Sequence, residues 1–267
     1  MTLFRLLHAL GAALPGGFPH ATALGNRVLR PLYGGSRGRV RVSVWDGLLF
    51  DVDPSETIGG NLAFAPRAFE YHERRFLEGC LREGGSFVDV GANIGIFSLF
   101  AARLVGPSGR VVAFEPDPQN AAMLREHVRL NGFERIVECV ELGISARSET
   151  RHVSTPNPAN RGATVLTATG SGPAVQCVAL AEALEATSCA NVDVLKIDIE
   201  GQELEVLEPL FAEVAAGRAP APAHLIVEAE GGPHSADAGY VERLGAAIEG
   251  AGYRLGRRGL NSFYSLQ

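Results

Sequence analysis

The sequence predicts an α/β fold built on a mainly parallel sheet, and three observations support it. Phe87–Ser98 (FVDVGANIGIFS) runs from an apolar strand through a glycine-containing turn into a helical pattern. Val192–Ile199 is apolar on both faces, as a central parallel strand covered by helices must be. Strand and helix patterns alternate to the end of the chain, where Tyr253–Leu255 and Ser262–Leu266 lie close enough to form an antiparallel hairpin.

The other elements follow from periodicity and turn signals. Met1–Gly38 predicts one short amphipathic helix and then a weakly structured lead rich in Gly and Pro. Arg39–Asp53 alternates apolar and polar residues around Asp46-Gly47, which predicts a hairpin. Further strands are expected at Arg110–Phe114, Ile136–Leu142 and His224–Val227, and helices at Glu70–Arg82, Ile96–Leu104, Pro116–Leu130, Leu180–Ala186, Gln202–Ala216 and Val241–Gly250.

Between Ser145 and Val178 the pattern changes to short strands separated by Pro, Asn, Gly and Ser. Two β runs, Thr164–Thr169 and Val175–Val178, predict a hairpin inserted over the main sheet. We therefore expect an N-terminal arm with its hairpin over residues 1–68 and a main domain over residues 69–267, with the insertion at about residues 145–178.

Charge and composition narrow the classes of partner. The net charge is −6, but residues 1–45 hold six arginines and no acidic residue, so the rest of the chain carries about −12. A basic arm can touch nucleic acid or anionic lipid, although a solvated extension is the commoner case, and the acidic body argues against a nucleic-acid substrate. No apolar stretch is long enough to span a membrane, which argues against stable membrane insertion.

The four cysteines are widely spaced, without a CxxC pair or a nearby histidine at ligand spacing. They are typical of small core residues in a reducing compartment, so we expect a cytoplasmic protein and no zinc site. A signal peptide over the first residues is disfavoured because His8, Gly11 and Pro15 interrupt the apolar stretch. A homo-oligomer is left open.

The glycine turn after the first sheet strand predicts a nucleoside-binding site. Gly91 and Gly95 let the backbone turn sharply near a ligand, and Glu115, at the end of the second strand, is placed to accept ribose hydroxyls. The turn lacks the middle glycine of the dinucleotide fingerprint, and Asp89 suits the ammonium of an amino acid better than a diphosphate. S-adenosylmethionine (SAM) has both an amino-acid tail and a ribose. An ordinary α/β turn without a ligand is the alternative.

A second group of charges ends the fourth strand. Lys196, Asp198 and Glu200 alternate, which predicts that they lie on one side of the strand, and Glu228 ends the neighbouring strand. Charges in a buried strand are costly unless paired, so Lys196 is expected to pair with an acid. These carboxylates are either a structural ion pair or groups that face the reacting atoms, and together they could also hold Mg²⁺. Glu203 is expected to cap or pair locally, and His72 and His152 are candidate bases by residue type alone.

Three segments resemble one protein family: Asp89–Gly95 (DVGANIG), Ala113–Asn120 (AFEPDPQN) and above all Leu195–Leu207 (LKIDIEGQELEVL). They are similar to FkbM-type methyltransferases, class I SAM-dependent enzymes that mostly methylate hydroxyls of sugars and natural products. The resemblance runs from about Tyr71 to Tyr253 and includes Asn160-Arg161-Gly162. It implies a Rossmann-like sheet of seven strands with the last one antiparallel.

The resemblance implies O-methylation of a small molecule, with N-methylation or a non-catalytic SAM-binding protein as alternatives. The insertion and the N-terminal arm would then cover the site and select the acceptor. A nicotinamide oxidoreductase is disfavoured because no Tyr–Lys pair stands at useful spacing. The candidate cofactor-binding residues are Asp89, Gly91, Ala92, Asn93, Gly95, Glu115, Pro116, Glu141 and Leu142, and the candidate catalytic residues are Lys196, Asp198, Glu200 and Glu228.

Overall fold

The computed structural model describes residues 3–17, 20–34, 38–156, 162, 164–187, 189, 191–228 and 239–267. The chain divides into two compact units, and each is described by itself below. Unit 1 holds residues 1–75 and 155–163, and unit 2 holds residues 76–154 and 164–267. Residues 160 and 161 of the Asn160-Arg161-Gly162 segment lie outside the described residues.

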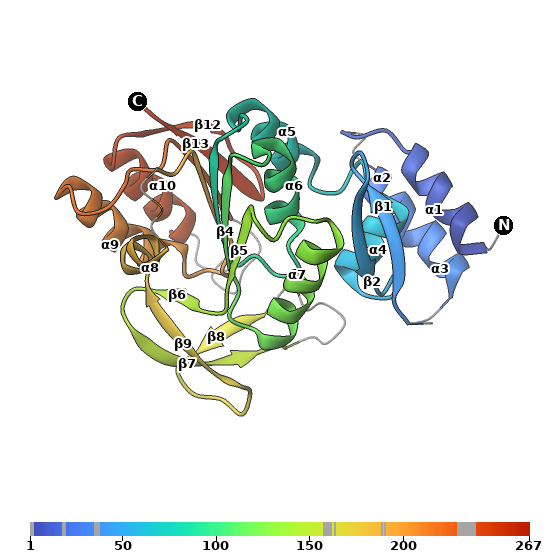
Figure 1. Ribbon diagram of the computed structural model, residues 1–267, viewed down its shortest axis with the longest axis horizontal. Coiled ribbons are helices and arrows are strands. Elements are labelled where there is room, and N and C mark those ends of the chain that lie inside the picture. Colours follow the sequence, from blue (N-terminus) through green and yellow to red (C-terminus); the bar gives the residue numbers. More distant parts are fainter. Residues whose placement is uncertain are drawn as a thin grey trace. The chain divides into compact units, whose positions relative to one another are not determined.

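Unit 2 is built on a seven-stranded sheet with helices on both faces (Figure 1). The strand order is β12-β13-β11-β10-β3-β4-β5, and β13 runs antiparallel to β11. This confirms the predicted Rossmann-like sheet of seven strands, the last of them antiparallel, and its terminal hairpin. The strands are β3 (Ser86–Val90), β4 (Arg110–Phe114), β5 (Val137–Val140), β10 (Val194–Ile197), β11 (His224–Glu228), β12 (Tyr253–Arg257) and β13 (Asn261–Leu266).

The covering helices begin and end close to the predicted positions. They are α5 (Tyr71–Cys80), whose first residues belong to unit 1, α6 (Ile96–Val105), α7 (Pro118–Leu130), α8 (Leu180–Ala186), α9 (Glu203–Ala215) and α10 (Tyr240–Gly250). In Figure 1, α6 and α7 lie on one side of the sheet and α8, α9 and α10 on the other. Helix α7 begins at Pro118, which has no N–H group and so leaves no unpaired donor at that position of the first turn. The Asp117 side chain caps this end of the helix by accepting a hydrogen bond from Gln119 N at 2.8 Å.

The main core fills the face of the sheet that is covered by α8, α9 and α10. Leu195 and Ile197 of β10 and Leu225 and Val227 of β11 are fully buried there, and Leu207 of α9 packs on the same cluster. Alternate residues of β10 face opposite sides, so Val194 and Lys196, also buried, face the other layer. A parallel strand that is buried on both faces therefore carries one charged side chain, which the site must compensate.

The insertion is a four-stranded sheet rather than the predicted hairpin. Its order is β6-β9-β7-β8, so β7 lies between the two strands that were expected to pair. Gly172 explains the crossing: a Cβ there would lie 1.9 Å from Val153 O, so only glycine lets the linker after β8 pass so close to β7. The strands are β6 (Gly143–Ser145), β7 (Glu149–Ser154), β8 (Val165–Thr167) and β9 (Ala174–Ala179).

Unit 1 contains the predicted hairpin and more helix than predicted. Strands β1 (Val40–Val44) and β2 (Leu48–Val52) pair antiparallel across a turn in which Asp46 and Gly47 have positive φ. The expected weakly structured lead is wrong for residues 21–33, which are helical. The helices are α1 (Leu3–Ala13), α2 (Ala21–Leu24), the π-helix η1 (Gly25–Leu29), α3 (Arg30–Tyr33) and α4 (Thr57–Phe64).

Two glycines in the helices of unit 1 allow close helix packing, and neither lies in a loop. A Cβ on Gly11 of α1 would lie 2.2 Å from Phe64 O, and one on Gly25 of η1 would lie 2.7 Å from the same atom. Both helices therefore approach the end of α4 more closely than any larger residue allows. The Gly content that suggested a flexible lead is a condition for this close packing.

Candidate active site

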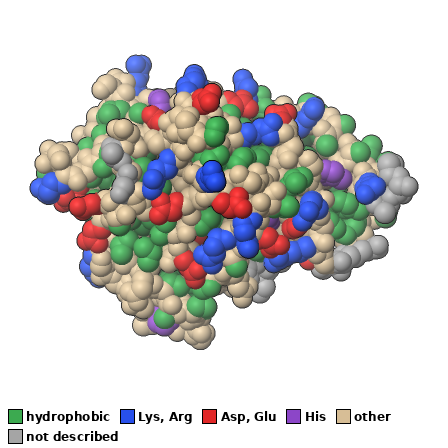
Figure 2. Space-filling view, in the orientation of Figure 1, with side chains coloured by type: hydrophobic (Ala, Val, Ile, Leu, Met, Phe, Trp, Pro, Cys, Tyr) green, Lys and Arg blue, Asp and Glu red, His purple; other side chains and the backbone are tan. Residues whose placement is uncertain are grey.

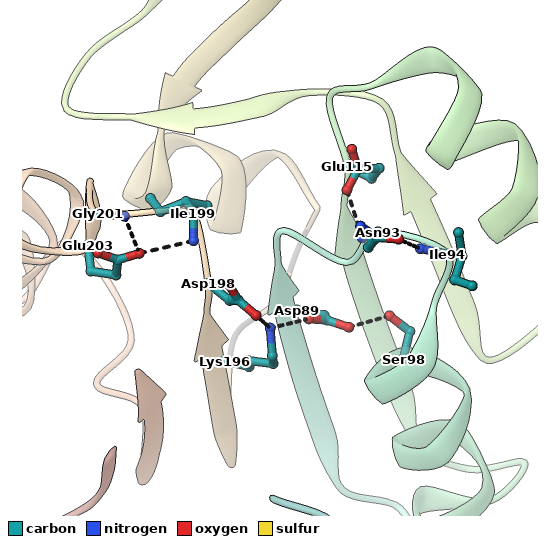
Figure 3. A network of polar contacts seen from close by, with 10 residues as sticks. All are labelled: Asp89, Asn93, Ile94, Ser98, Glu115, Lys196, Asp198, Ile199, Gly201 and Glu203. Atoms are coloured by element: carbon teal, nitrogen blue, oxygen red, sulfur yellow. Dashed lines mark hydrogen bonds and ion pairs between the residues drawn. The ribbon is translucent and has the colours of Figure 1, made fainter. Parts of the chain in front are cut away.

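The predicted site residues come from the carboxyl ends of the parallel strands β3, β4, β10 and β11, which meet at one edge of the sheet (Figure 3). Strand β3 lies between β4 and β10, so the chain order of the strands reverses beside it. Open α/β sheets bind ligands at such a switch point. The register pairs Asp89 with Lys196 and places the β3 turn beside the residues that follow β10.

The glycine turn after β3 is shaped by contacts with its neighbours. Gly91 and Gly95 have φ of +78° and +91°, and the N–H groups of Gly91 and Ala92 both donate to Phe114 O at the end of β4. A Cβ on Gly91 would lie 2.0 Å from Asp198 O. The absence of a side chain at Gly91 therefore brings the end of β10, with its acids, directly against the turn.

Glu115 ties this turn to the end of β4. Its Oε2 accepts from Asn93 N at 2.7 Å and its Oε1 from Asp117 N at 2.9 Å, while Asn93 has a φ of +51° and bonds Ile94 N through its own side chain. Burial raises the pKa of Glu115 to about 7, although these backbone hydrogen bonds oppose the rise. Each carboxylate oxygen has two lone pairs, so Glu115 keeps acceptor capacity for the two hydroxyls of a ribose.

Asp89 forms a buried charge pair with Lys196 rather than an open cofactor contact. It is fully buried, its Oδ2 accepts from Ser98 Oγ at 2.6 Å, and its Oδ1 lies 3.9 Å from Lys196 Nζ with no hydrogen-bond partner among the described residues. Burial raises the pKa of Asp89, and the Lys196 charge partly offsets this. The enclosed carboxylate leaves no exposed face for the ammonium that the sequence predicted beside it.

Lys196 joins this pair to the exposed acids of the site. Its side chain is 2% exposed, and its Nζ donates to Asp198 Oδ2 at 2.8 Å. Burial alone would raise the pKa of Asp198, but the charge and hydrogen bond of Lys196 outweigh it and hold the pKa below its ordinary value. The predicted pairing of Lys196 with an acid is confirmed, and the ammonium lies between two carboxylates (Figure 3).

Asp198, Glu200 and Glu228 form what we call the acid trio: each offers a carboxylate oxygen within 4.8 Å of the others, and all three are partly exposed. Strand alternation does not explain the grouping, because β10 ends at Ile197 and Glu200 has a φ of +57°. The turn, not the strand, brings Glu200 to Asp198. Oxygen atoms in this arrangement are also the donor set that Mg²⁺ uses.

The three carboxyl groups of the acid trio have different pKa values. Burial, with the charge of Asp198, raises the pKa of Glu228 to about 10, and burial and the charges of Asp198 and Glu203 raise the pKa of Glu200 to about 7. At neutral pH, Asp198 is therefore ionised, Glu228 is protonated and Glu200 is close to half protonated. Two acids with pKa values pushed apart are the usual arrangement of a general acid–base site.

Glu203 holds the loop that carries these acids. It is fully buried at the start of α9, and its Oε1 accepts from Ile199 N at 3.0 Å and Gly201 N at 3.1 Å (Figure 3). Its Oε2 accepts from Tyr240 Oη at 2.7 Å. Glu203 was expected to cap or pair locally, and the structure shows local pairing with the loop before α9 rather than a cap of the helix. With every oxygen occupied by the protein, Glu203 is a positioning residue.

Other predicted residues lie elsewhere along the edge. Glu141 is exposed and pairs with Arg125 at 2.8 Å, and Leu142 packs against the core, so only their backbone is left for a cofactor. Pro116 is half-buried between Glu115 and Asp117. His152 lies in β7 with its Nδ1 3.2 Å from Gly172 O, and His72 is exposed on α5. Neither histidine belongs to the acid trio.

The insertion sheet contacts the residue that follows the acids. Gln202 Nε2 donates to Leu166 O of β8 at 3.3 Å, and Arg151 Nη1 of β7 donates to Gln202 Oε1. Gln202 is two residues after Glu200. The contact supports the predicted covering role of the insertion, whereas the role predicted for the N-terminal arm stays a prediction.

Several supporting residues were not predicted from the sequence. Ser98 bonds Asp89, Tyr240 bonds Glu203, and the fully buried His127 lies with Nδ1 2.8 Å from Ile94 O in the glycine turn, while the Asn120 side chain lowers the pKa of Glu115. Ser98 and Asn120 stand within the motifs quoted above, so a polar residue in a buried helix position was the available signal. Tyr240 lies far from the Leu195–Leu207 motif in sequence, and no sequence pattern indicated its contact with Glu203.

Comparisons with known proteins give one family and one curated relative. The family profile of the Methyltransferase FkbM domain matches residues 89–255. Methyltransferase sdnD of Sordaria araneosa is 30% identical over 157 residues, 47% of this chain, and the chain spans 60% of the length of that curated relative.

Two solved structures illustrate the likeness in fold. A methyltransferase FkbM from Methylobacillus flagellatus KT is 15% identical, with a TM-score of 0.46, over 73% of this chain and 50% of that chain. A SAM-dependent methyltransferase from Aquifex aeolicus is 20% identical, with a TM-score of 0.42, over 72% of this chain and 86% of that chain.

Proposed function

Because this chain belongs to the Methyltransferase FkbM domain family, we propose that it transfers a methyl group from SAM to a hydroxyl of a sugar or natural-product small molecule. The observation that carries the proposal is the acid trio, held within 4.8 Å beside a glycine turn at the switch point of the sheet. The turn offers backbone and Glu115 oxygen atoms for a nucleoside, and the acids offer a proton acceptor. Methyl transfer from SAM to oxygen needs both.

The residues present fit SAM in chemistry. Glu115 would accept the ribose hydroxyls, and the backbone of the turn around Asn93 would hold the amino-acid tail, since Asp89 is enclosed. When bound, SAM supplies an electrophilic methyl group on sulfur. The carbon–sulfur bond breaks as the bond to the acceptor oxygen forms, and the hydroxyl proton leaves to a carboxylate.

We assign that proton to Glu200 and the orientation of the acceptor to Asp198. A general base works best with a pKa near the working pH, and the pKa of Glu200 is about 7. Asp198 is ionised but is held by Lys196, which makes it a weak base and a fixed hydrogen-bond acceptor. Positioning supplies much of the acceleration in such a displacement, and the proton transfer contributes roughly 10²–10⁴-fold.

A divalent cation is the alternative occupant of the acid trio. Lys196 Nζ already places a positive charge 2.8 Å from Asp198 Oδ2, and a shared proton on Glu228 relieves the remaining repulsion. We therefore propose charge balance without Mg²⁺. Treatment with a chelator should leave turnover unchanged, and a loss that added Mg²⁺ restores would replace the shared proton with a metal.

The experiment measures formation of S-adenosylhomocysteine by the purified chain with pools of hydroxylated sugars and natural products. Glu200→Gln and Asp198→Asn should each keep cofactor binding within about twofold and lower turnover by roughly 10²-fold or more. Glu205→Gln, at an exposed acid on the helix α9 that follows the acid-bearing turn, is the matched control. Normal turnover in both site variants would reject the catalytic assignment, and absence of turnover with every pool would favour a non-catalytic SAM-binding protein.

Product analysis separates the remaining alternatives. Methyl ethers support the proposed O-methylation, whereas methylamines would assign the N-methyl alternative. We also propose a small-molecule acceptor rather than nucleic acid, on the acidic charge of the chain beyond residue 45. A cytoplasmic location is proposed on the cysteines, all four of which are free thiols. The oligomeric state stays a prediction.

A further inference from the structure

Large aliphatic side chains are exposed mainly at the start of unit 1. Eight large hydrophobic side chains are exposed among the described residues, and six of them lie between residues 3 and 32. These are Leu3, Leu6, Leu10, Leu24, Val28 and Leu32, with exposed fractions from 41% to 60%. Singly exposed leucines are ordinary on protein surfaces, but a cluster of this kind marks an interaction surface.

The six side chains follow helical spacing. Leu3, Leu6 and Leu10 recur along one side of α1, and Leu7 and Gly11, in the row beside them, are buried. Leu24, Val28 and Leu32 are four residues apart along the continuous helical stretch α2–η1–α3, in a row beside the buried Ala21, Gly25 and Leu29. Each helical stretch therefore has an apolar side that is wider than the part packed against the unit, and its outer margin faces solvent.

The exposed sides belong to a fixed surface and not to a loose arm. Gly11 and Gly25 hold both helical stretches against Phe64 O, as described above. His8 Nδ1 lies 2.7 Å from Ala63 O, and Asn26 Nδ2 donates to Asn61 Oδ1 at 2.6 Å. The Phe4 and Tyr33 rings, with centroids 5.6 Å apart, join α1 to α3. These contacts fix which residues face outward.

The charged side chains of these two helical stretches are all basic. Arg5 and Arg27 are exposed on these helices, Arg30 is half-buried, and no acidic residue precedes Asp46. Where α1 and α3 lie in Figure 1, the space-filling view shows hydrophobic and arginine side chains together at the surface (Figure 2). Exposed leucines beside arginines, without acids, are the composition of helices that lie in the interface of an anionic bilayer.

We propose that this leucine–arginine face, formed by the six aliphatic residues above with Arg5 and Arg27, binds the surface of a membrane that contains anionic lipids. The leucines enter the boundary between headgroups and acyl chains, and the arginines contact lipid phosphates. The binding is peripheral, because no helix among the described residues is long and apolar enough to cross a bilayer. The proposal is independent of the methyl-transfer chemistry.

The test is sedimentation of the full chain with vesicles. Vesicles of phosphatidylcholine with about one third phosphatidylglycerol should bind the protein at least about tenfold more tightly than phosphatidylcholine alone, and added salt should weaken the binding. The double variant Leu6→Ser, Leu32→Ser removes side chains that are 43% and 60% exposed. It should lower the partition constant by about tenfold or more.

The matched control is Leu260→Ser, Leu266→Ser, in unit 2, where the side chains are 59% and 41% exposed. It should bind vesicles as the unchanged protein does, and thermal melts should show that both double variants are folded. Equal loss of binding in the control, or no binding to anionic vesicles, would overturn the proposal. A chain that does not bind vesicles but forms a dimer would also overturn it. If the double variant Leu6→Ser, Leu32→Ser dissociates that dimer, the face is an interface between two copies.

Discussion

Replacing Lys196 by Met tests the buried charge network most severely. The substitution keeps most of the apolar stem but removes the ammonium that lies 2.8 Å from Asp198 Oδ2 and 3.9 Å from Asp89 Oδ1. Asp198 is 32% exposed and can be hydrated, whereas Asp89 is fully buried. The cost therefore falls mainly on Asp89, which keeps only the hydrogen bond from Ser98 among the described contacts of its carboxylate.

The expected loss in the free energy of unfolding is about 3–5 kcal/mol at pH 7, the range for a buried charge that loses its partner. Protonation of Asp89 limits this loss of stability. Burial already raises the pKa of Asp89, and without Lys196 the pKa rises further, so the folded variant takes up a proton that the unfolded chain releases. That uptake becomes easier as the pH falls, by about 1.4 kcal/mol per pH unit. The stability gap between Lys196→Met and the unchanged protein should therefore narrow from pH 7 to pH 5.

Urea denaturation followed by circular dichroism at the two pH values measures this gap. The second variant, Lys196→Met with Asp89→Asn, removes the uncompensated charge and should recover most of the loss at pH 7, with little dependence on pH. Lys196→Met with normal stability at pH 7 would refute the reasoning. A gap of equal size at both pH values would show that lost packing, and not charge, is the cause.

Three further predictions concern the site. Turnover should rise with pH through about 7, because the base form of Glu200 exists above its pKa; a flat profile in the unchanged protein would exclude this role, and Glu200→Gln should lack the rise. Glu115→Gln should weaken binding of S-adenosylhomocysteine by about tenfold or more in calorimetry, since it disturbs both ribose recognition and the bond to Asn93 N. Tyr240→Phe should lower the free energy of unfolding by about 1–3 kcal/mol in urea, because buried Glu203 loses a donor; no loss would show that the bond is not stabilising.

The parts of the fold that could be predicted from the sequence are those in which local pattern and burial agree. Strand β4 and helix α8 have the predicted bounds, because an apolar run between turn signals leaves few alternatives. Residues 21–33 were mispredicted because Gly25 has a tertiary role in packing against Phe64, which no local pattern reveals. The place of β7 between β8 and β9 likewise depends on long-range pairing.

For the site, the sequence indicated which acids gather but not how. Strand alternation brings Lys196 and Asp198 together, whereas Glu200 arrives through a left-handed turn, a conformation seldom predicted for glutamate. Asp89 was expected to face the cofactor, but its register opposite Lys196 encloses it. Side chains that come from distant elements, such as Tyr240 on α10, become visible only in three dimensions.

The most direct test of the account is calorimetric titration of the purified chain with S-adenosylhomocysteine. The proposed cofactor site at the glycine turn and Glu115, beside the acid trio, predicts saturable binding of one ligand per chain, weakened by Glu115→Gln and little changed by Glu200→Gln. A titration of the folded, unchanged protein that shows no binding would contradict the assignment of this edge of the sheet as the cofactor site.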